Sequence, residues 1–216
     1  MNINTENLGS GIEMIISLLL LETLASLSKD DIVIIIDEPE LHLHPTLQEQ
    51  FIQYLKKISS EKQIIVSTHS PYFFKNCCSD NNIKLLVTEI VNNKTLIKDA
   101  EIQLSTFPWS PSWGEINYFA YGLSTVEFHN ELYGYLHHIS EKPRILDFDR
   151  YLIDLGIKNN KKWEKNYQGS IKNYDVTLMT YIRNIIHHPE NQYNSSYTPD
   201  ELILSISQML DLLKKI

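Results

Sequence analysis

The chain has 216 residues, of which 43% are hydrophobic and 21% are charged, with only 7 Gly and 8 Pro. This composition excludes collagen-like, disordered and low-complexity proteins, and the length is sufficient for one large domain or two small ones. The formal net charge of −8 excludes an overall basic nucleic-acid-binding surface.

The apolar runs and the cysteines indicate the cellular setting. The longest apolar run, residues 15–21 interrupted by Ser17, is far shorter than the ~20 residues that a membrane-spanning helix needs. The two cysteines, Cys77 and Cys78, are adjacent, and the sequence shows no secretory signal. We therefore expect a cytoplasmic protein that makes no contact with a membrane and has no structural disulfide.

The first predicted element is an apolar helix over residues 12–27, which follows the turn Leu8-Gly9-Ser10-Gly11. A turn of small residues that leads into a helix N-terminus exposes backbone N–H groups, and these favour an anion. The turn is therefore a candidate anion-binding site.

Two acids follow the first predicted strand. The β-branched run at residues 32–36 is typical of a strand buried on both faces, and it ends in Asp37 and Glu38. Open α/β sheets bind ligands at the carboxyl ends of their strands. In phosphate chemistry the first acid can hold Mg²⁺ and the second can orient an attacking water. The alternative is that the acids merely begin a solvated turn.

A short histidine-containing segment comes next. His42 and His44, with nearby Glu40, could ligate zinc. Two alternate histidines do not supply a complete ligand set, so we favour a structural role for them.

A second buried strand lies downstream. Residues 46–58 have the spacing of an amphipathic helix, and the apolar run at residues 63–67 is followed by His69. The order strand, helix, strand predicts a parallel pair with a right-handed crossover, which is α/β architecture. If both strands share a sheet, His69 lies where a γ-phosphate would sit.

A hairpin and a linker end the first half. Residues 84–91 and 95–98 form the predicted strands, and residues 105–114 form a linker that contains two prolines. We therefore divide the chain into an α/β part with flanking helices at residues 1–104 and a second part at residues 115–216.

The second part contains no convincing strand, and it is predicted to be an all-α bundle. Capping boxes are expected at Ser124 with Glu127 and at Thr198 with Glu201. The predicted helices cover residues 115–123, 124–139, 146–155, 174–187 and 198–214.

A locally basic segment stands out in this part. Residues 158–174 hold five lysines interleaved with Trp163, Tyr167 and Tyr174. This pattern would suit the binding of RNA.

Arg183, His187 and His188 form the second candidate site. Arg183 and His187 are four residues apart and share a helix face, whereas His188 is about 140° away on an unbroken helix. The residue before Pro189 is pushed out of the α region, so His188 can be re-aimed. Both histidines remain candidates. The alternative is that Arg183 pairs with an acid and the histidine segment caps the helix.

Three motifs taken together resemble a known family. They are Leu8-Gly-Ser-Gly11, Ile35-Ile-Asp-Glu-Pro-Glu-Leu-His-Leu-His-Pro45 and Ser67-Thr-His-Ser-Pro71. The series resembles the second half of an ABC-type or SMC-like AAA ATPase head, as found in overcoming-lysogenization-defect nucleases and related bacterial anti-phage proteins. The resemblance covers roughly residues 8–98.

The resemblance implies a role for each matching residue. Asp37 would be the Mg²⁺-associated acid, Glu38 the catalytic base and His69 the switch histidine. Ser10 and Gly11 would belong to a signature motif that contacts the γ-phosphate of ATP held by the opposing protomer.

The resemblance also implies a homodimer of heads that closes around ATP and Mg²⁺, with the loop at residues 40–45 crossing the dimer interface. One part of the family pattern is missing, because no G-x-x-x-x-G-K-[ST] motif occurs in the sequence. We expect the phosphate-binding loop to lie in a missing half of the ATPase, on the same polypeptide or on another. A degenerate head that only dimerises is the alternative.

The helical part resembles a second family. The pattern R-N-x-x-x-H at Arg183 is similar to the motif of HEPN ribonucleases, which are small helical bundles. The resemblance implies metal-independent cleavage of an RNA, such as a tRNA-like substrate, with Arg183 and His187 or His188 in catalysis. The sequence therefore predicts a defence ATPase head that controls a ribonuclease. The alternative is a nucleotide-gated scaffold whose helical part binds a separate nuclease or toxin subunit.

Overall fold

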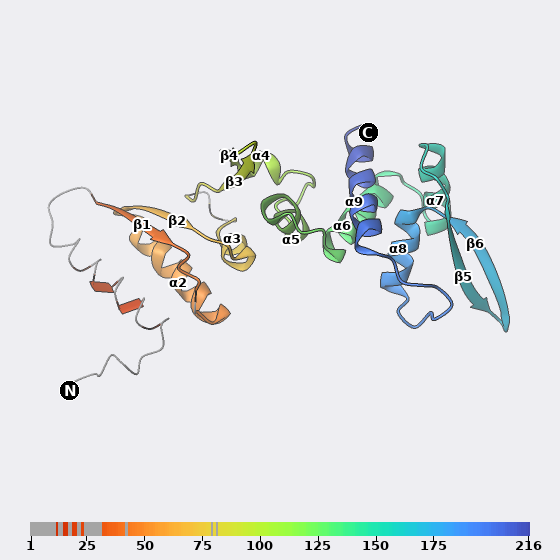
Figure 1. The fold of residues 1–216 in the computed structure, drawn as a ribbon, viewed down its shortest axis with the longest axis horizontal. Coiled ribbons are helices and arrows are strands. Elements are labelled where there is room, and N and C mark those ends of the chain that lie inside the picture. The colour runs from red at the N-terminus through yellow and green to blue at the C-terminus, as the bar shows by residue number, and fades with distance from the viewer. Residues whose placement is uncertain are drawn as a thin grey trace. The chain divides into compact units, whose positions relative to one another are not determined.

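The structure is a computed structural model that describes residues 32–41, 43–78, 80 and 82–216, together with residues 12, 15, 16, 19, 20 and 23. Most of the predicted helix at residues 12–27 lies outside the described residues, as do Ser10, Gly11 and His42. The chain divides into two compact units, Met1–Leu85 and Leu86–Ile216 (Figure 1). This division lies ahead of the linker expected at residues 105–114.

The first unit is built on a parallel strand pair, as predicted. β1 (Val33–Asp37) pairs with β2 (Gln63–Ser67) in a register that sets Asp37 opposite Ser67. Helix α2 (Pro45–Ile58) connects the strands, and α3 (Pro71–Cys77) follows β2. One face of α2 packs against one face of the strand pair, and the apolar residues of the two faces form the core of the unit. Its buried residues are Ile36, Leu43, Phe51, Ile52, Leu55 and Phe73.

The second unit begins with the predicted hairpin. β3 (Leu86–Val91) pairs antiparallel with β4 (Lys94–Asp99), and Val91 lies opposite Lys94. Asn92 and Asn93 both have positive φ, at 52° and 58°, which is the backbone that a two-residue hairpin turn requires. Helix α4 (Ala100–Gln103) follows directly.

The segment expected to be a linker is a fixed loop. Glu115 is fully buried, and its carboxylate accepts hydrogen bonds from the Thr106 backbone N–H at 2.7 Å and the Ser112 backbone N–H at 2.8 Å. It also accepts one from the Ser110 hydroxyl at 2.6 Å. A side chain that lies beyond the two prolines therefore ties the loop to α5 (Trp113–Glu115) and to the short π-helix η2 (Ile116–Ala120).

Four longer helices form the bundle. They are α6 (Val126–Ile139), α7 (Ile145–Asp154), α8 (Leu178–His187) and α9 (Pro199–Leu213). The capping box at Thr198 and Glu201 is present, as predicted. The expected box at Ser124 is wrong, because the Thr125 side chain caps α6 by accepting a hydrogen bond from Phe128 N.

The prediction that the second part contains no strand is also wrong. β5 (Lys161–Tyr167) and β6 (Ser170–Val176) form an antiparallel hairpin around Gln168 and Gly169, whose φ values are 52° and 83°. As a result α8 begins at Leu178, after the N-cap Thr177, and not at residue 174. The second unit is therefore a helical bundle with two hairpins. No helix in the part of the chain that the structure describes is long and apolar enough to cross a membrane.

A buried histidine inside the bundle makes its stability depend on pH. His129 is fully buried, and its Nε2 lies 3.0 Å from the Ser205 hydroxyl. Burial is the main cause that lowers the pKa of this imidazole to about 3. The unfolded chain takes up a proton near the ordinary value of 6.5, so lowering the pH from 6.5 towards 3 favours unfolding.

We expect the free energy of unfolding to fall by at most about 1.4 kcal/mol for each pH unit below 6.5 because of His129. Urea titrations monitored by tryptophan fluorescence test this pH dependence, since all three tryptophans lie in the second unit. His129→Leu should flatten the pH dependence by that amount. An equal pH dependence in the variant and in the wild type would contradict the assignment.

Candidate functional site

The candidate site in the first unit lies where β1 and β2 end together. The Ser67 hydroxyl donates a hydrogen bond to Asp37 Oδ1, and the Glu38 backbone N–H donates to the Ser67 carbonyl at 3.0 Å. Glu38 adopts a left-handed backbone, with φ at 43°. This conformation is costly for a residue with a Cβ, and it turns the chain sharply after the second acid.

Glu38 and His69 face one another across this edge. His69 Nε2 lies 3.5 Å from Glu38 Oε1. The His69 side chain is 86% exposed and the Glu38 side chain is 33% exposed, so the pair is accessible to a ligand. The structure thus brings together Asp37, Glu38 and His69, as the parallel pairing predicted.

Glu40 holds the turn that carries His69, a role that the sequence did not reveal. Its Oε1 accepts three hydrogen bonds, from the Thr68 hydroxyl at 2.6 Å, from His69 N at 2.8 Å and from Ser70 N at 3.1 Å. The Glu40 side chain is buried, with 8% exposed. One carboxylate oxygen therefore fixes the segment after β2 to the segment after β1.

We expect Glu40→Ala to lower the free energy of unfolding by about 3 kcal/mol, because it leaves three donors without their charged acceptor. Glu40→Gln keeps an acceptor oxygen and should cost about 1 kcal/mol. Urea unfolding followed by circular dichroism is the suitable measurement, since the first unit has no tryptophan. Glu49→Ala on the exposed face of α2 is the matched control, and an equal loss in both alanine variants would refute the role of Glu40.

The residues at this edge fit a magnesium ion that is bound chiefly through phosphates. Mg²⁺ usually takes one or two carboxylates and completes its coordination with substrate phosphates and water. Asp37 offers one exposed carboxylate beside the Ser67 hydroxyl. Within the described ranges no group of three or more His, Cys, Asp or Glu side chains could hold a metal ion. His44 instead caps α2, where its Nδ1 accepts from Thr46 N at 3.4 Å.

The second candidate site lies at the C-terminal end of α8. The Arg183 Nη1 donates to Asn184 Oδ1 at 3.1 Å, so its side-chain partner here is a buried amide and not an acid. Partial burial, and then the positive charges of Arg183 and His188, lower the pKa of the His187 imidazole. A neutral imidazole at this position can accept a proton at pH 7.

His188 stands where the chain leaves the helix. Its φ of −130° and ψ of 60° depart from α geometry, as the following proline predicts. Its Nδ1 lies 3.2 Å from Glu190 Oε1, and its ring centroid lies 6.1 Å from that of Trp163 on β5. The structure therefore brings both candidate histidines to the end of the helix that carries Arg183.

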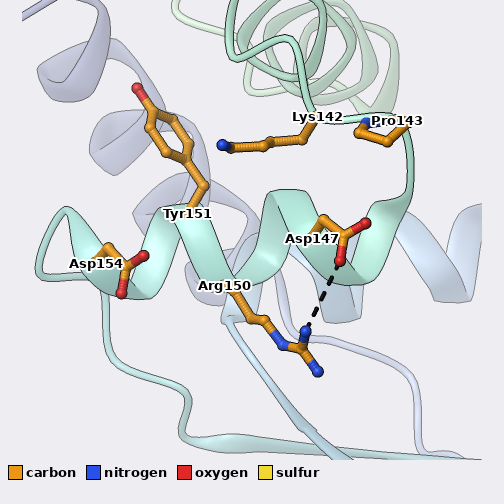
Figure 2. A pocket seen from close by; sticks show the side chains of 6 residues that line it. All are labelled: Lys142, Pro143, Asp147, Arg150, Tyr151 and Asp154. Carbon is orange, nitrogen blue, oxygen red and sulfur yellow. Dashed lines mark ion pairs between the residues drawn. The ribbon is translucent and has the colours of Figure 1, made fainter.

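A shallow pocket lies elsewhere, along α7. It is lined by Lys142, Pro143, Asp147, Arg150, Tyr151 and Asp154 (Figure 2). Asp147 pairs with Arg144 at 2.7 Å and with Arg150 at 3.8 Å, so the central charges of the pocket compensate one another. None of the residues predicted from the sequence to act in catalysis lines this pocket.

Comparison with known proteins gives a family match over part of the chain. The model of the AAA ATPase domain matches residues 1–74. This match confirms the ATPase resemblance of the segment that contains Asp37, Glu38 and His69.

Curated relatives are similar over parts of the chain. An uncharacterised protein of Methanocaldococcus jannaschii is 33% identical over 104 residues, which are 48% of this chain and 24% of that protein. The Septu protein PtuA of Bacillus thuringiensis is 40% identical over 57 residues, 26% of this chain and 14% of that protein. The OLD nuclease of Thermus scotoductus is 39% identical over 70 residues, 32% of this chain and 13% of that protein. The chain thus spans a quarter or less of the length of these relatives.

Proposed function

We propose that the first unit is part of the ATP-binding and ATP-hydrolysing head of a bacterial defence ATPase. The observation that carries this proposal is the Glu38 and His69 pair at the ends of two parallel strands, within the segment that matches the AAA ATPase domain. The similarity to an OLD nuclease and to a Septu protein supports the defence setting.

Each residue has a distinct task in the proposed reaction. Glu38 orients the attacking water and takes up its proton, and His69 contacts the γ-phosphate from the neighbouring strand. Asp37 would hold Mg²⁺, which neutralises charge on the phosphates when it is bound. Glu40 keeps His69 at this position through the three hydrogen bonds to the segment after β2.

The complete nucleotide site needs groups from elsewhere. The phosphate-binding loop would come from the missing half of the ATPase, on this polypeptide or on another. Ser10 and Gly11 would contact the γ-phosphate held by a second head, so that ATP closes a homodimer and hydrolysis reopens it.

Phosphate release from ATP by the complete protein tests this proposal. We expect release that requires Mg²⁺ and that rises more steeply than linearly with protein concentration, because two heads share each ATP. Release that is equal with and without a metal chelator would refute the proposed role of Asp37.

We further propose that the second unit is a metal-independent ribonuclease controlled by the head. The grouping of Arg183 with two histidines at one helix end favours this candidate, since the lowered pKa of His187 leaves a neutral base beside a cation. The base would take the proton of a ribose 2′-hydroxyl, which attacks the adjacent phosphorus and displaces the 5′-oxygen of the next nucleotide. The leaving 5′-oxygen takes a proton from water, so the products are a 2′,3′-cyclic phosphate and a 5′-hydroxyl, and DNA is resistant.

A cleavage assay on RNA, with the ends of the fragments identified by mass spectrometry, tests the ribonuclease. A triggered ATPase that leaves RNA intact would favour the other proposal, a nucleotide-gated scaffold whose second unit binds a separate nuclease or toxin subunit.

A further inference from the structure

The hairpin β5–β6 carries a charge opposite to that of the chain. Residues 158–176 contain five lysines and two acids, whereas the whole chain has a net charge of −8. Alternate residues of a strand lie on opposite faces of a sheet. Four residues of β5 and their four register partners on β6 therefore share one face, namely Lys161, Trp163, Lys165, Tyr167, Ser170, Lys172, Tyr174 and Val176.

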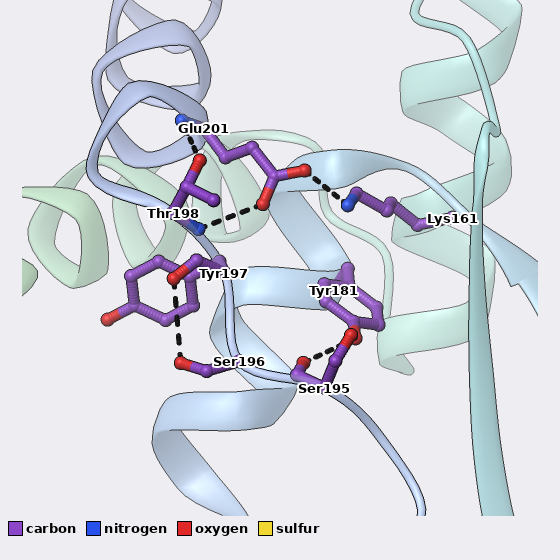
Figure 3. Close-up of polar contacts among 7 residues, drawn as sticks. All are labelled: Lys161, Tyr181, Ser195, Ser196, Tyr197, Thr198 and Glu201. Carbon is purple, nitrogen blue, oxygen red and sulfur yellow. Dashed lines mark hydrogen bonds and ion pairs between the residues drawn. The ribbon is translucent and has the colours of Figure 1, made fainter.

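The half of this face nearest the bundle is used inside the fold. Trp163 and Val176 are buried against Tyr181 of α8. Lys161 forms an ion pair with Glu201, the residue that completes the capping box of α9, and its Nζ stands 5.1 Å from the centroid of the Tyr181 ring (Figure 3). These groups anchor the hairpin and are not free to hold a ligand.

The outer half of the face is cationic and open. Lys165 and Lys172 lie directly opposite one another across the strands, and both are exposed. Like charges at such a position are destabilising. Neither lysine forms an ion pair with any residue that the structure describes. Lys172 Nζ lies 4.5 Å from the centroid of the Tyr167 ring, so one face of that ring is already covered.

We propose that Lys165, Tyr167 and Lys172 form a docking surface for the phosphate backbone of an RNA strand. Two exposed ammonium groups on one face attract the phosphates of a nucleic-acid backbone, and the tyrosine ring, which Lys172 covers on one side, favours backbone contacts over base stacking. Behind the outer half, the buried Trp163 of the same hairpin lies beside His188, with ring centroids 6.1 Å apart. The outer half therefore belongs to the hairpin that packs against the end of α8.

The choice of RNA rests on the proposed ribonuclease, because the hairpin that carries the surface contacts His188 through Trp163. Docking and cleavage are nevertheless separate properties. A protein that binds RNA through these residues without cutting it would refute the ribonuclease and leave the docking surface in place.

The test is fluorescence anisotropy of a labelled single-stranded RNA titrated with the full chain. Titrations at about 50, 100 and 200 mM NaCl give the slope of the logarithm of the binding constant against the logarithm of the salt concentration. The variant is Lys165→Gln with Lys172→Gln. The matched control is Lys214→Gln with Lys215→Gln, which removes the same charge from the end of α9.

We expect the hairpin variant to weaken the Kd about tenfold at the lowest salt and to flatten the slope by about 1.4, since each single-stranded phosphate contact contributes about 0.7. The control should change the Kd less than about twofold, by the same reasoning. Equal weakening in both variants, absence of RNA binding by the wild type, or tighter binding of a DNA of the same sequence would each overturn the proposal.

The melting temperature of the hairpin variant should not fall, because a like-charge pair is removed. If the double variant fails to fold, Lys172→Gln alone provides the same comparison against Lys215→Gln.

Discussion

Glu38→Gln in the complete protein is expected to reduce ATP turnover about 100-fold or more while ATP remains bound, because an amide cannot accept the proton of the attacking water. The substitution preserves the size of the side chain. It leaves the three hydrogen bonds of Glu40 intact, so the turn that carries His69 should keep its position. Loss of turnover would then report on chemistry and not on folding.

Two measurements separate binding from chemistry in this variant. Phosphate release gives turnover, and light scattering on a gel-filtered sample with ATP gives the fraction of closed dimer, which should increase. Glu61→Gln, which changes an exposed acid in the same unit, is the control and should retain wild-type turnover. Turnover in Glu38→Gln within threefold of the wild type would remove Glu38 from the catalytic role.

Arg183→Ala is expected to lower RNA cleavage by about 10²- to 10³-fold, the effect of removing one preorganised group that stabilises developing charge. Arg183 is partly buried and donates to Asn184, so the alanine variant also leaves a buried amide oxygen without this donor. Arg183→Lys restores a positive charge, though not the planar fork of donors, and should recover part of the activity. A purely structural role would not give this partial rescue.

Arg150→Ala provides the matched control for that experiment. Arg150 is exposed on α7, and its ion pair with Asp147 has an N–O distance of 3.8 Å, so its removal should have little effect on stability. Cleavage is measured in the presence of a metal chelator, and the fragment ends are identified. Unchanged cleavage in Arg183→Ala, or products that end in a 3′-hydroxyl, would exclude the proposed mechanism.

The strand pair of the first unit was predictable from its β-branched runs, but the predicted burial on both faces was wrong, because Ile35 on the outer face is 74% exposed. The β-branched run before Asp37 and the apolar run before Ser67 fit strands whose inner face packs on α2. The side-by-side placement of the acids and His69 followed from the order of the elements alone. The hydrogen bonds of Glu40 could not be predicted, because every residue except proline has a backbone N–H and the sequence does not show which of them a carboxylate will contact.

The hairpin β5–β6 was missed for a different reason. Its lysines and aromatics alternate with the period of a strand, yet only Trp163 and Val176 of the two strands are buried. Composition therefore indicated a charged segment, and the two-residue turn at Gln168 and Gly169 was the signal that could have identified the strands. The tertiary contacts to Tyr181 decide the structure of this segment.

The carboxylate of Glu115 determines where this polypeptide can be divided for experiments. A fragment that starts at residue 115 would lose the three donors contributed by residues 106, 110 and 112, and a buried charge without partners costs several kcal/mol. Such a fragment should express poorly for reasons unrelated to its activity. A cut between residues 85 and 86 respects the compact units, and it keeps the two prolines with the helices that they precede.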